Sequence, residues 1–121
     1  MRIAVIDDEK GILLSLRLYL EIEGHLVLAF SSPLEALREI TQDKVDLIIL
    51  DMRMPEMSGE EVAKVLKSNI KTKEIPIILF SAHEKLAEVA SRVGAQGILE
   101  KPFQFSKLND LISFFQECKK A

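Results

Sequence analysis

Residues 46–61, DLIILDMRMPEMSGEE, begin as an apolar run that ends on a charge. Leu47 to Leu50 are all aliphatic, which is the pattern of a strand covered on both faces of a parallel sheet. Asp51 follows at the point where that strand should end. A carboxylate there must be hydrated, paired or bound to a metal, because burying an isolated charge costs many kcal/mol. The function of this stretch therefore depends on which other residues meet Asp51.

Four further apolar runs accompany this one, and segments with helical spacing separate them. In order, the five runs are IAVID (3–7), LVLAF (26–30), DLIILD (46–51), IPIILF (75–80) and GILE (97–100). This alternation predicts an α/β fold with a five-stranded parallel sheet, right-handed crossovers and helices on both faces. No repeat, linker or low-complexity tract interrupts the order, so we expect one domain over residues 1–121.

Polar residues mark where two of the helices should begin. Ser32 precedes a first-turn proline, and Ser58 precedes two glutamates that suit the positive end of a helix dipole. In the helix after Ser58, we expect Val62, Val65 and Leu66 to form the stripe that faces the core.

The composition excludes several classes of function. With 48% hydrophobic and 29% charged residues the chain has a normal globular balance, and no apolar run is long enough to span a bilayer. The N-terminus lacks the features of a secretory signal, so we expect a cytoplasmic protein that acts without a membrane. A net charge of −3 argues against nucleic-acid binding. The single cysteine, Cys118, is expected to be a partly buried residue of the last helix.

Polar residues gather where the predicted strands end, which is where parallel α/β sheets place their sites. Asp7 and Asp8 end the first strand, Asp51 the third and Ser81 the fourth, while Lys101 follows the fifth. Each of these residues alone is weak evidence for a site, but five of them at one edge of a sheet are unlikely to have gathered by chance. Three carboxylates repel one another and recruit a cation, and oxygen ligands favour Mg²⁺. A carboxylate beside Mg²⁺ and a lysine can act as a nucleophile towards a phosphoryl group.

Taken together, the acidic pair at 7–8, LDMRMPEMSG (50–59), FSA (80–82) and EKPF (100–103) resemble the receiver domain of two-component response regulators, of the stand-alone, single-domain type. The resemblance covers essentially the whole chain. It implies a flavodoxin-like (βα)5 three-layer sandwich with strand order 2-1-3-4-5. It also implies a phosphoacceptor that is phosphorylated by a histidine kinase or a histidine phosphotransfer protein. Such a domain catalyses only its own phosphotransfer and dephosphorylation, so it is not an enzyme in the ordinary sense, and we expect a monomer.

The resemblance assigns the acidic residues to the phosphoryl group and to Mg²⁺. Asp51 matches the phosphoacceptor, and Asp8 matches the residue that binds Mg²⁺ directly. Asp7 matches the neighbouring acid, which often acts through water. Arg53 stands where the family uses a main-chain carbonyl as a metal ligand.

Three further positions match the family, and one departs from it. Ser81 matches the switch hydroxyl, Lys101 the lysine that contacts the phosphoryl group, and Pro102 a proline that usually follows a cis peptide bond. Ile98 departs, because the family usually carries Tyr or Phe at that place. With neither ring nor hydroxyl at Ile98, the usual ring rotation cannot report phosphorylation. Either the loop after Ser81 carries the signal, or the domain is a relay that needs little switching, and we favour the relay.

Two side chains are expected to flank the mouth of the site. Arg53 lies two residues after the acceptor, and His83 lies two residues after Ser81. These polar groups would order or exclude the water that hydrolyses the acyl phosphate, and so set its lifetime. The alternative is that both are solvated loop residues.

The first predicted helix carries leucines on both of its sides. Leu14, Leu18 and Ile22 fall opposite the inward face, and a helix that is apolar all round is either deeply buried or covered by a partner. In the resembling family, the histidine-bearing helices of the phosphoryl donor dock on this helix. We therefore predict that Leu14 and Leu18 belong to a docking surface. Scattered surface leucines are the alternative.

Other functions fit the sequence less well. A flavin-binding module would need a phosphate cradle where this chain has DDEKG (7–11), and the P-loop signature is absent. An aspartyl-phosphate phosphatase would need a second Asp where Arg53 stands. The strongest rival is a receiver-like module that binds partners without being phosphorylated.

Overall fold

The structure, a computed structural model, describes residues 1–82 and 85–120. Within these ranges, five strands alternate with five helices. In order they are β1 (Arg2–Ile6), α1 (Lys10–Ile22), β2 (Leu26–Phe30), α2 (Pro33–Glu39), β3 (Leu47–Asp51), α3 (Gly59–Ser68), β4 (Ile77–Ser81), α4 (Leu86–Val93), β5 (Gly97–Glu100) and α5 (Phe105–Lys120).

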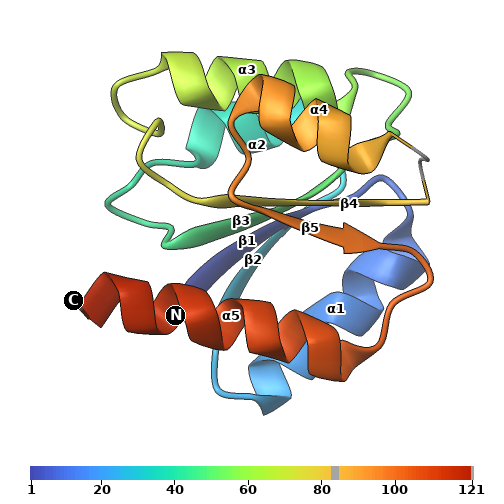
Figure 1. Cartoon of the computed structure of the whole chain (residues 1–121), viewed down its shortest axis with the longest axis vertical. Coiled ribbons are helices and arrows are strands. Elements are labelled where there is room, and N and C mark those ends of the chain that lie inside the picture. The colour runs from blue at the N-terminus through green and yellow to red at the C-terminus, as the bar shows by residue number, and fades with distance from the viewer. Residues whose placement is uncertain (83–84, 121) are drawn as a thin grey trace.

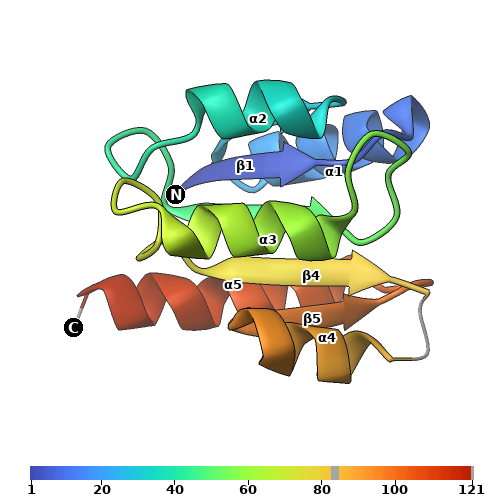
Figure 2. The same ribbon diagram turned by 90° about the horizontal axis from the view of Figure 1, so that it is seen from above.

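The five strands form one parallel sheet in the order β2-β1-β3-β4-β5, which confirms the predicted topology. β1 pairs with β2 on one side and with β3 on the other. The strand order therefore reverses between β1 and β3, and the carboxyl ends of the strands point the same way (Figure 2). Ligand sites of open α/β sheets lie at such a reversal.

Helices cover both faces of the sheet. α2, α3 and α4 lie on one face, and α1 and α5 lie on the other (Figure 1). The buried residues accordingly form two clusters, one under each layer of helices. β3 is buried along its whole length because its alternate side chains enter the two clusters.

Serine caps begin the two helices for which they were predicted. The hydroxyl of Ser32 accepts a hydrogen bond from the Glu35 amide at 3.3 Å, and that of Ser58 accepts one from the Glu61 amide at 3.2 Å. These bonds satisfy amides that have no partner within the helix.

Two sequence predictions about helix faces were wrong. Val65 is 40% exposed, because the small Ala63 faces the core beside Val62 and Leu66 and turns Val65 to the edge of that stripe. Cys118 is a free, exposed thiol, since the buried positions of α5 run through Ile112 and Phe115 and leave Cys118 beside their line. Of the helices in the described ranges, none combines the length and the apolar character that crossing a bilayer requires.

Candidate functional site

The sheet register brings the predicted polar residues to one edge. Ile6 of β1 pairs with Leu50 of β3, so the residues that follow them, Asp7 and Asp51, lie side by side. Asp51 pairs with Phe80 of β4, and Ser81 pairs with Glu100 of β5, directly before Lys101. The structure thus places Asp7, Asp51, Ser81 and Lys101 along four neighbouring strand ends.

Three carboxylates converge at this edge. Asp7, Asp8 and Asp51 each offer an oxygen atom, and these atoms lie within 4.8 Å of one another. Asp7 is fully buried and Asp51 is 3% exposed. One oxygen of Asp7, Oδ1, accepts a hydrogen bond from the Glu9 amide at 2.9 Å. The other, Oδ2, is buried without a hydrogen-bond partner among the described residues.

Lys101 is the cation that faces the carboxylates. Its Nζ lies 3.5 Å from Asp51 Oδ1 and 3.8 Å from Asp7 Oδ2. The same ammonium sits 4.6 Å above the centre of the Phe80 ring, whose π face attracts it. The Lys101 amide donates to the Ser81 carbonyl at 3.0 Å, and the peptide bond between Lys101 and Pro102 is cis.

Burial raises the pKa of two carboxyls in the site. For Asp7 burial is the main cause, the Asp51 charge adds to it, and together they raise its pKa to about 6. Burial also raises the pKa of Asp51, although the nearby Lys101 ammonium opposes this effect. Carboxyl groups whose pKa is shifted in this way by burial and neighbouring charges are typical of functional sites.

The donor set fits a hard divalent cation. Three carboxylates supply only oxygen, which suits Mg²⁺ and its habit of keeping several water ligands. Asp7 Oδ2 has no hydrogen bond among the described residues, so a cation or its water would give this buried oxygen a partner. Asp7, Asp8 and Asp51 are therefore the residues that could hold the metal.

The start of α3 packs directly against the main chain of Asp51, which the sequence prediction missed. The Gly59 amide donates to the Met52 carbonyl at 2.9 Å. A Cβ atom on Gly59 would lie 2.3 Å from the Asp51 carbonyl oxygen and 2.8 Å from the Met52 Cα. Only glycine permits this approach, so Gly59 helps to hold the acceptor strand end.

Arg53 and Ile98, two further predicted residues, lie outside the carboxylate cluster. Arg53 is exposed and lines a cavity of about 370 Å³ between α3 and α4, together with Lys85 and Arg92. Ile98 is half-buried against the core under α4. His83 lies outside the described residues.

The docking surface predicted on α1 is exposed. Leu14 is 57% and Leu18 is 52% exposed, whereas Leu13, Leu16 and Leu20 of the same helix are buried. The helix thus has an apolar outer side in addition to its core side.

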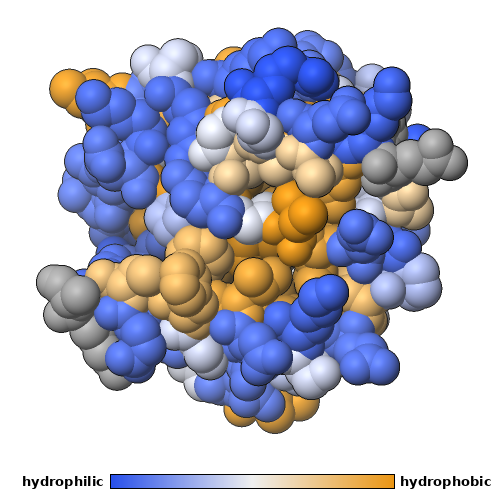
Figure 3. All heavy atoms as spheres, in the orientation of Figure 1, coloured by the Kyte–Doolittle hydropathy of each residue, from blue (hydrophilic) through white to orange (hydrophobic). Residues whose placement is uncertain are grey.

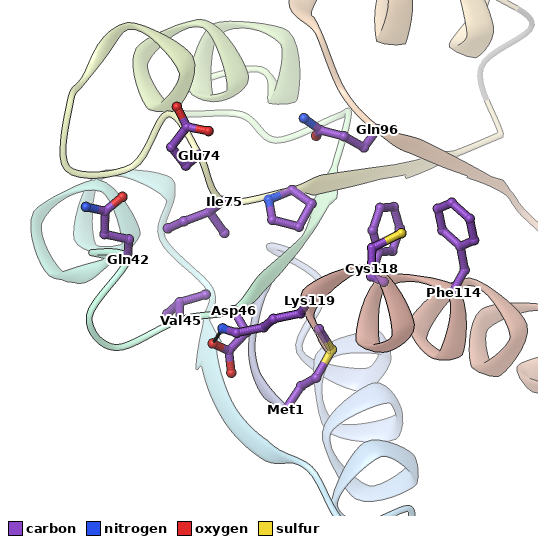
Figure 4. Close-up of a pocket in the computed structure, with 12 residues that line it drawn as sticks. Met1, Gln42, Val45, Asp46, Glu74, Ile75, Gln96, Phe114, Cys118 and Lys119 are labelled. Carbon is purple, nitrogen blue, oxygen red and sulfur yellow. Dashed lines mark hydrogen bonds and ion pairs between the residues drawn. The ribbon is translucent and has the colours of Figure 1, made fainter. Parts of the chain in front are cut away.

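A separate cavity of about 660 Å³ opens at the opposite edge of the sheet, beside the end of α5 (Figure 4). Val45, Phe114 and Cys118 line it. Asp46, at its edge, pairs with Arg2 at 2.9 Å and also with Lys119. The Arg2 guanidinium and the Lys119 ammonium hold the pKa of the Asp46 carboxyl well below its usual range. No residue of the carboxylate cluster lines this cavity, and the ion pairs tie β1 to α5.

Comparisons with known proteins agree with this geometry. A family model described as the response regulator receiver domain matches residues 3–113. The response regulator MprA of Mycobacterium avium (strain 104) is 34% identical over 110 residues, which are 89% of this chain and 47% of that protein. The chain thus spans about half the length of the curated relatives that it matches.

Solved structures resemble the whole chain. A response regulator receiver domain protein from Clostridium thermocellum has a TM-score of 0.87 and 35% identity, covering 98% of this chain and 96% of that one. The response regulator TrrA from Thermotoga maritima, solved in complex with Mg²⁺ and BeF, has a TM-score of 0.83 and 33% identity, covering 94% and 97%.

Proposed function

The chain belongs to the response regulator receiver domain family, and on that premise we propose that Asp51 is its phosphoacceptor. The observation that carries the proposal is the position of the Asp51 carboxylate, which lies 3.5 Å from the Lys101 ammonium and offers an oxygen within 4.8 Å of carboxylate oxygens of Asp7 and Asp8. That arrangement presents a nucleophile to a phosphoryl group and leaves room for a cation.

In the proposed reaction, an oxygen of Asp51 attacks the phosphorus of a phosphohistidine. The new O–P bond forms with the carboxylate's electron pair, and the P–N bond breaks with its pair going to the imidazole nitrogen. Lys101 stabilises charge on the transferred oxygens, and Ser81 donates a hydrogen bond to one of them. Asp7 and Asp8, with the Arg53 carbonyl, would hold Mg²⁺, which supplies positive charge for the phosphoryl oxygens when bound. The structure of the response regulator TrrA, which was solved in complex with Mg²⁺ and BeF, supports the assignment of Mg²⁺.

The donor would be a histidine kinase or a histidine phosphotransfer protein, with the exchange in the cytoplasm, where receiver domains usually act. We propose that Leu14 and Leu18 contact its histidine-bearing helix. Their exposure on α1 supports this, as does a groove of about 520 Å³ between α1 and the loop after β5, which Lys101 itself lines. A donor that reaches Asp51 over Lys101 would cover this groove.

The proposal is tested with a small phosphodonor. Phosphoramidate and Mg²⁺ should add the mass of one phosphoryl group to the wild type, and none to Asp51→Asn. Asp43→Asn, which removes an exposed carboxylate far from the site, is the matched control and should be phosphorylated normally. A wild type that gains no mass would instead favour the module that binds partners without phosphorylation.

A further inference from the structure

Four aromatic rings run from Lys101 to the side of α1 that packs against the start of α5. The Phe80 ring, which lies under the Lys101 ammonium, meets Phe103 edge-on with 6.3 Å between ring centres. Phe103 meets Phe105 edge-on at 5.9 Å, and Phe105 stacks on Tyr19 at 4.3 Å. The Tyr19 hydroxyl also donates to the Phe105 carbonyl at 3.3 Å. We call these four residues, Phe80, Phe103, Phe105 and Tyr19, the aromatic series.

We propose that phosphorylation of Asp51 is reported through the aromatic series to the face formed by α1 and the start of α5. This inference rests on the proposed function, since it requires that Asp51 be phosphorylated. It assigns the readout to the same face that we propose for donor docking.

The inner end of the series responds directly to the charge on Asp51. The Lys101 ammonium contacts Asp51, Asp7 and the Phe80 ring at the same time. A phosphoryl group on Asp51 raises the negative charge there from one to about two and adds three strong acceptor oxygens. The ammonium must then shift towards those oxygens, which changes its contact with the Phe80 ring.

The loop after β5 couples this shift to the outer rings. Phe103 lies only two residues after Lys101, and the Lys101 amide is fixed to the Ser81 carbonyl. Ser81 at the end of β4 and Lys101 directly after β5 are the two predicted phosphoryl contacts. The hydrogen bond between them therefore joins both contacts to the start of the loop that carries Phe103. Phe80 is fully buried, and a packed interior transmits small displacements instead of absorbing them.

The outer end of the series lies on a surface that a partner can read. Phe103 and Phe105 line the groove beside α1, and Phe105 is 40% exposed. α1 and the start of α5 lie side by side there (Figure 1). The occupant we assign is the histidine-bearing helix of a phosphotransfer partner, because Lys101 lines this groove and also contacts the Asp51 carboxylate.

The competing route would use the face of α4, β5 and α5. Figure 3 shows apolar residues along the β5 edge between these helices. Ile98, however, has no ring with which to report on the site, and it packs against the core cluster on the opposite face of the sheet from Phe80. A domain that is phosphorylated and read out at one face suits a phosphorelay. The departure from the family pattern at Ile98 also favours a relay.

Tyr19 reports on the proposed route without any label, because the chain has one tyrosine and no tryptophan. The protein is phosphorylated with phosphoramidate and Mg²⁺, the phosphorylated fraction is measured by intact mass, and Tyr19 emission is recorded on the same sample. We expect the emission of the wild type to change in proportion to that fraction, and that of Asp51→Asn to stay constant. A wild type that is phosphorylated with unchanged emission would overturn this inference alone, and a wild type that gains no mass would overturn the proposed function with it.

Substitutions in the series test the route. Phe103→Leu and Phe105→Leu should each lose more than half of the Tyr19 response per phosphorylated molecule, with the phosphorylated fraction of each variant measured by intact mass after treatment with phosphoramidate. Phe114→Leu, an exposed phenylalanine of α5 outside the series, is the matched control and should keep the full response. If both Phe103→Leu and Phe105→Leu keep the wild-type response, the signal does not travel through these rings.

Discussion

Asp7 is a buried carboxyl that destabilises the metal-free fold when it is ionised. Its carboxylate is fully buried beside Asp51, and one of its oxygens has no hydrogen bond among the described residues. Burial and the Asp51 charge raise its pKa to about 6, above the value of about 4 in an unfolded chain. Above pH 6 the Asp7 carboxyl is ionised in both the folded and the unfolded state, so the full free-energy cost of burying its charge opposes folding.

Asp7→Asn should therefore stabilise the metal-free protein at pH 7, by about 1–3 kcal/mol. The gain should shrink below pH 4, where the wild-type carboxyl is protonated in both states. Urea denaturation in EDTA at the two pH values measures it. Adding Mg²⁺ should stabilise the wild type more than the variant, and an equal Mg²⁺ effect on both would contradict the proposed metal site.

Asp46 shows the opposite pH dependence. Its pKa is lowered in the folded state, chiefly by Arg2, so its stabilisation is present above about pH 4 and lost as the pH falls towards the folded value. Asp46→Asn should destabilise the protein at pH 7 by only about 1 kcal/mol, since solvent screens the exposed lysine in this cluster. Thermal melts at pH 7 and pH 3 check this, and a difference that persists undiminished at pH 3 would be inconsistent with it.

Arg53 bears on the lifetime of the phosphorylated state. Its exposed side chain follows the acceptor by two residues, and we expect it to affect the water that attacks the acyl phosphate. Arg53→Ala should change the dephosphorylation rate at least threefold, with little change in stability. The decay of the phosphorylated mass over time measures this rate. An Arg92→Ala variant, on the far wall of the same cavity, should decay as the wild type does, and an unchanged rate in Arg53→Ala would reject the role.

At the scale of elements, the contact between α3 and the end of β3 fixes the acceptor. The helix begins with a glycine so close to the Asp51 main chain that a methyl group would overlap its carbonyl oxygen. The Ser58 cap holds the first turn of the helix in the position that this contact requires.

Gly59→Ala should destabilise the fold by about 1–3 kcal/mol, because overpacking a tight contact forces the main chain to move. It should also slow phosphorylation by a small donor, since Asp51 moves with that main chain. Gly11→Ala is the matched control: a Cβ there meets nothing within 4 Å, and alanine favours a helix, so stability should be unchanged or slightly higher. Urea midpoints and phosphorylation rates together decide it, and equal midpoints for the two variants would refute the argument.

At the scale of the whole molecule, the outer side of α1 and the site are separate surfaces, so their functions can be separated. Leu14→Ser and Leu18→Ser should leave phosphorylation by phosphoramidate unchanged. Both should slow phosphotransfer from purified histidine kinases of the source organism by about tenfold, as loss of a central apolar contact would.

Leu34→Ser, an equally exposed leucine on α2, is the control and should transfer at the wild-type rate. If the α1 variants also transfer normally from every kinase that phosphorylates the wild type, the docking surface lies elsewhere.

Much of the architecture could be predicted from the sequence, because strand ends and helix caps are local signals. The apolar runs placed the strands, and the acids after β1 and β3 met at one edge because parallel strands share a direction. Contacts between residues that are far apart in the sequence were harder to predict. Nothing local shows that Phe80 lies under Lys101 or that Gly59 touches Asp51, since both contacts join segments through the sheet register. Val65 and Cys118 were misplaced because residue periodicity gives a helix face only to within a residue.

The buried Asp7 oxygen, which has no hydrogen bond among the described residues, also links the resistance of the protein to proteolysis to the magnesium concentration around it. A cation that binds the folded chain and not the unfolded one lowers the fraction of molecules that are open at any moment. Proteases cut mainly those open molecules when opening and closing are fast. Withdrawing magnesium would thus shorten the time for which the chain resists digestion, and the Asp7→Asn chain would be largely spared.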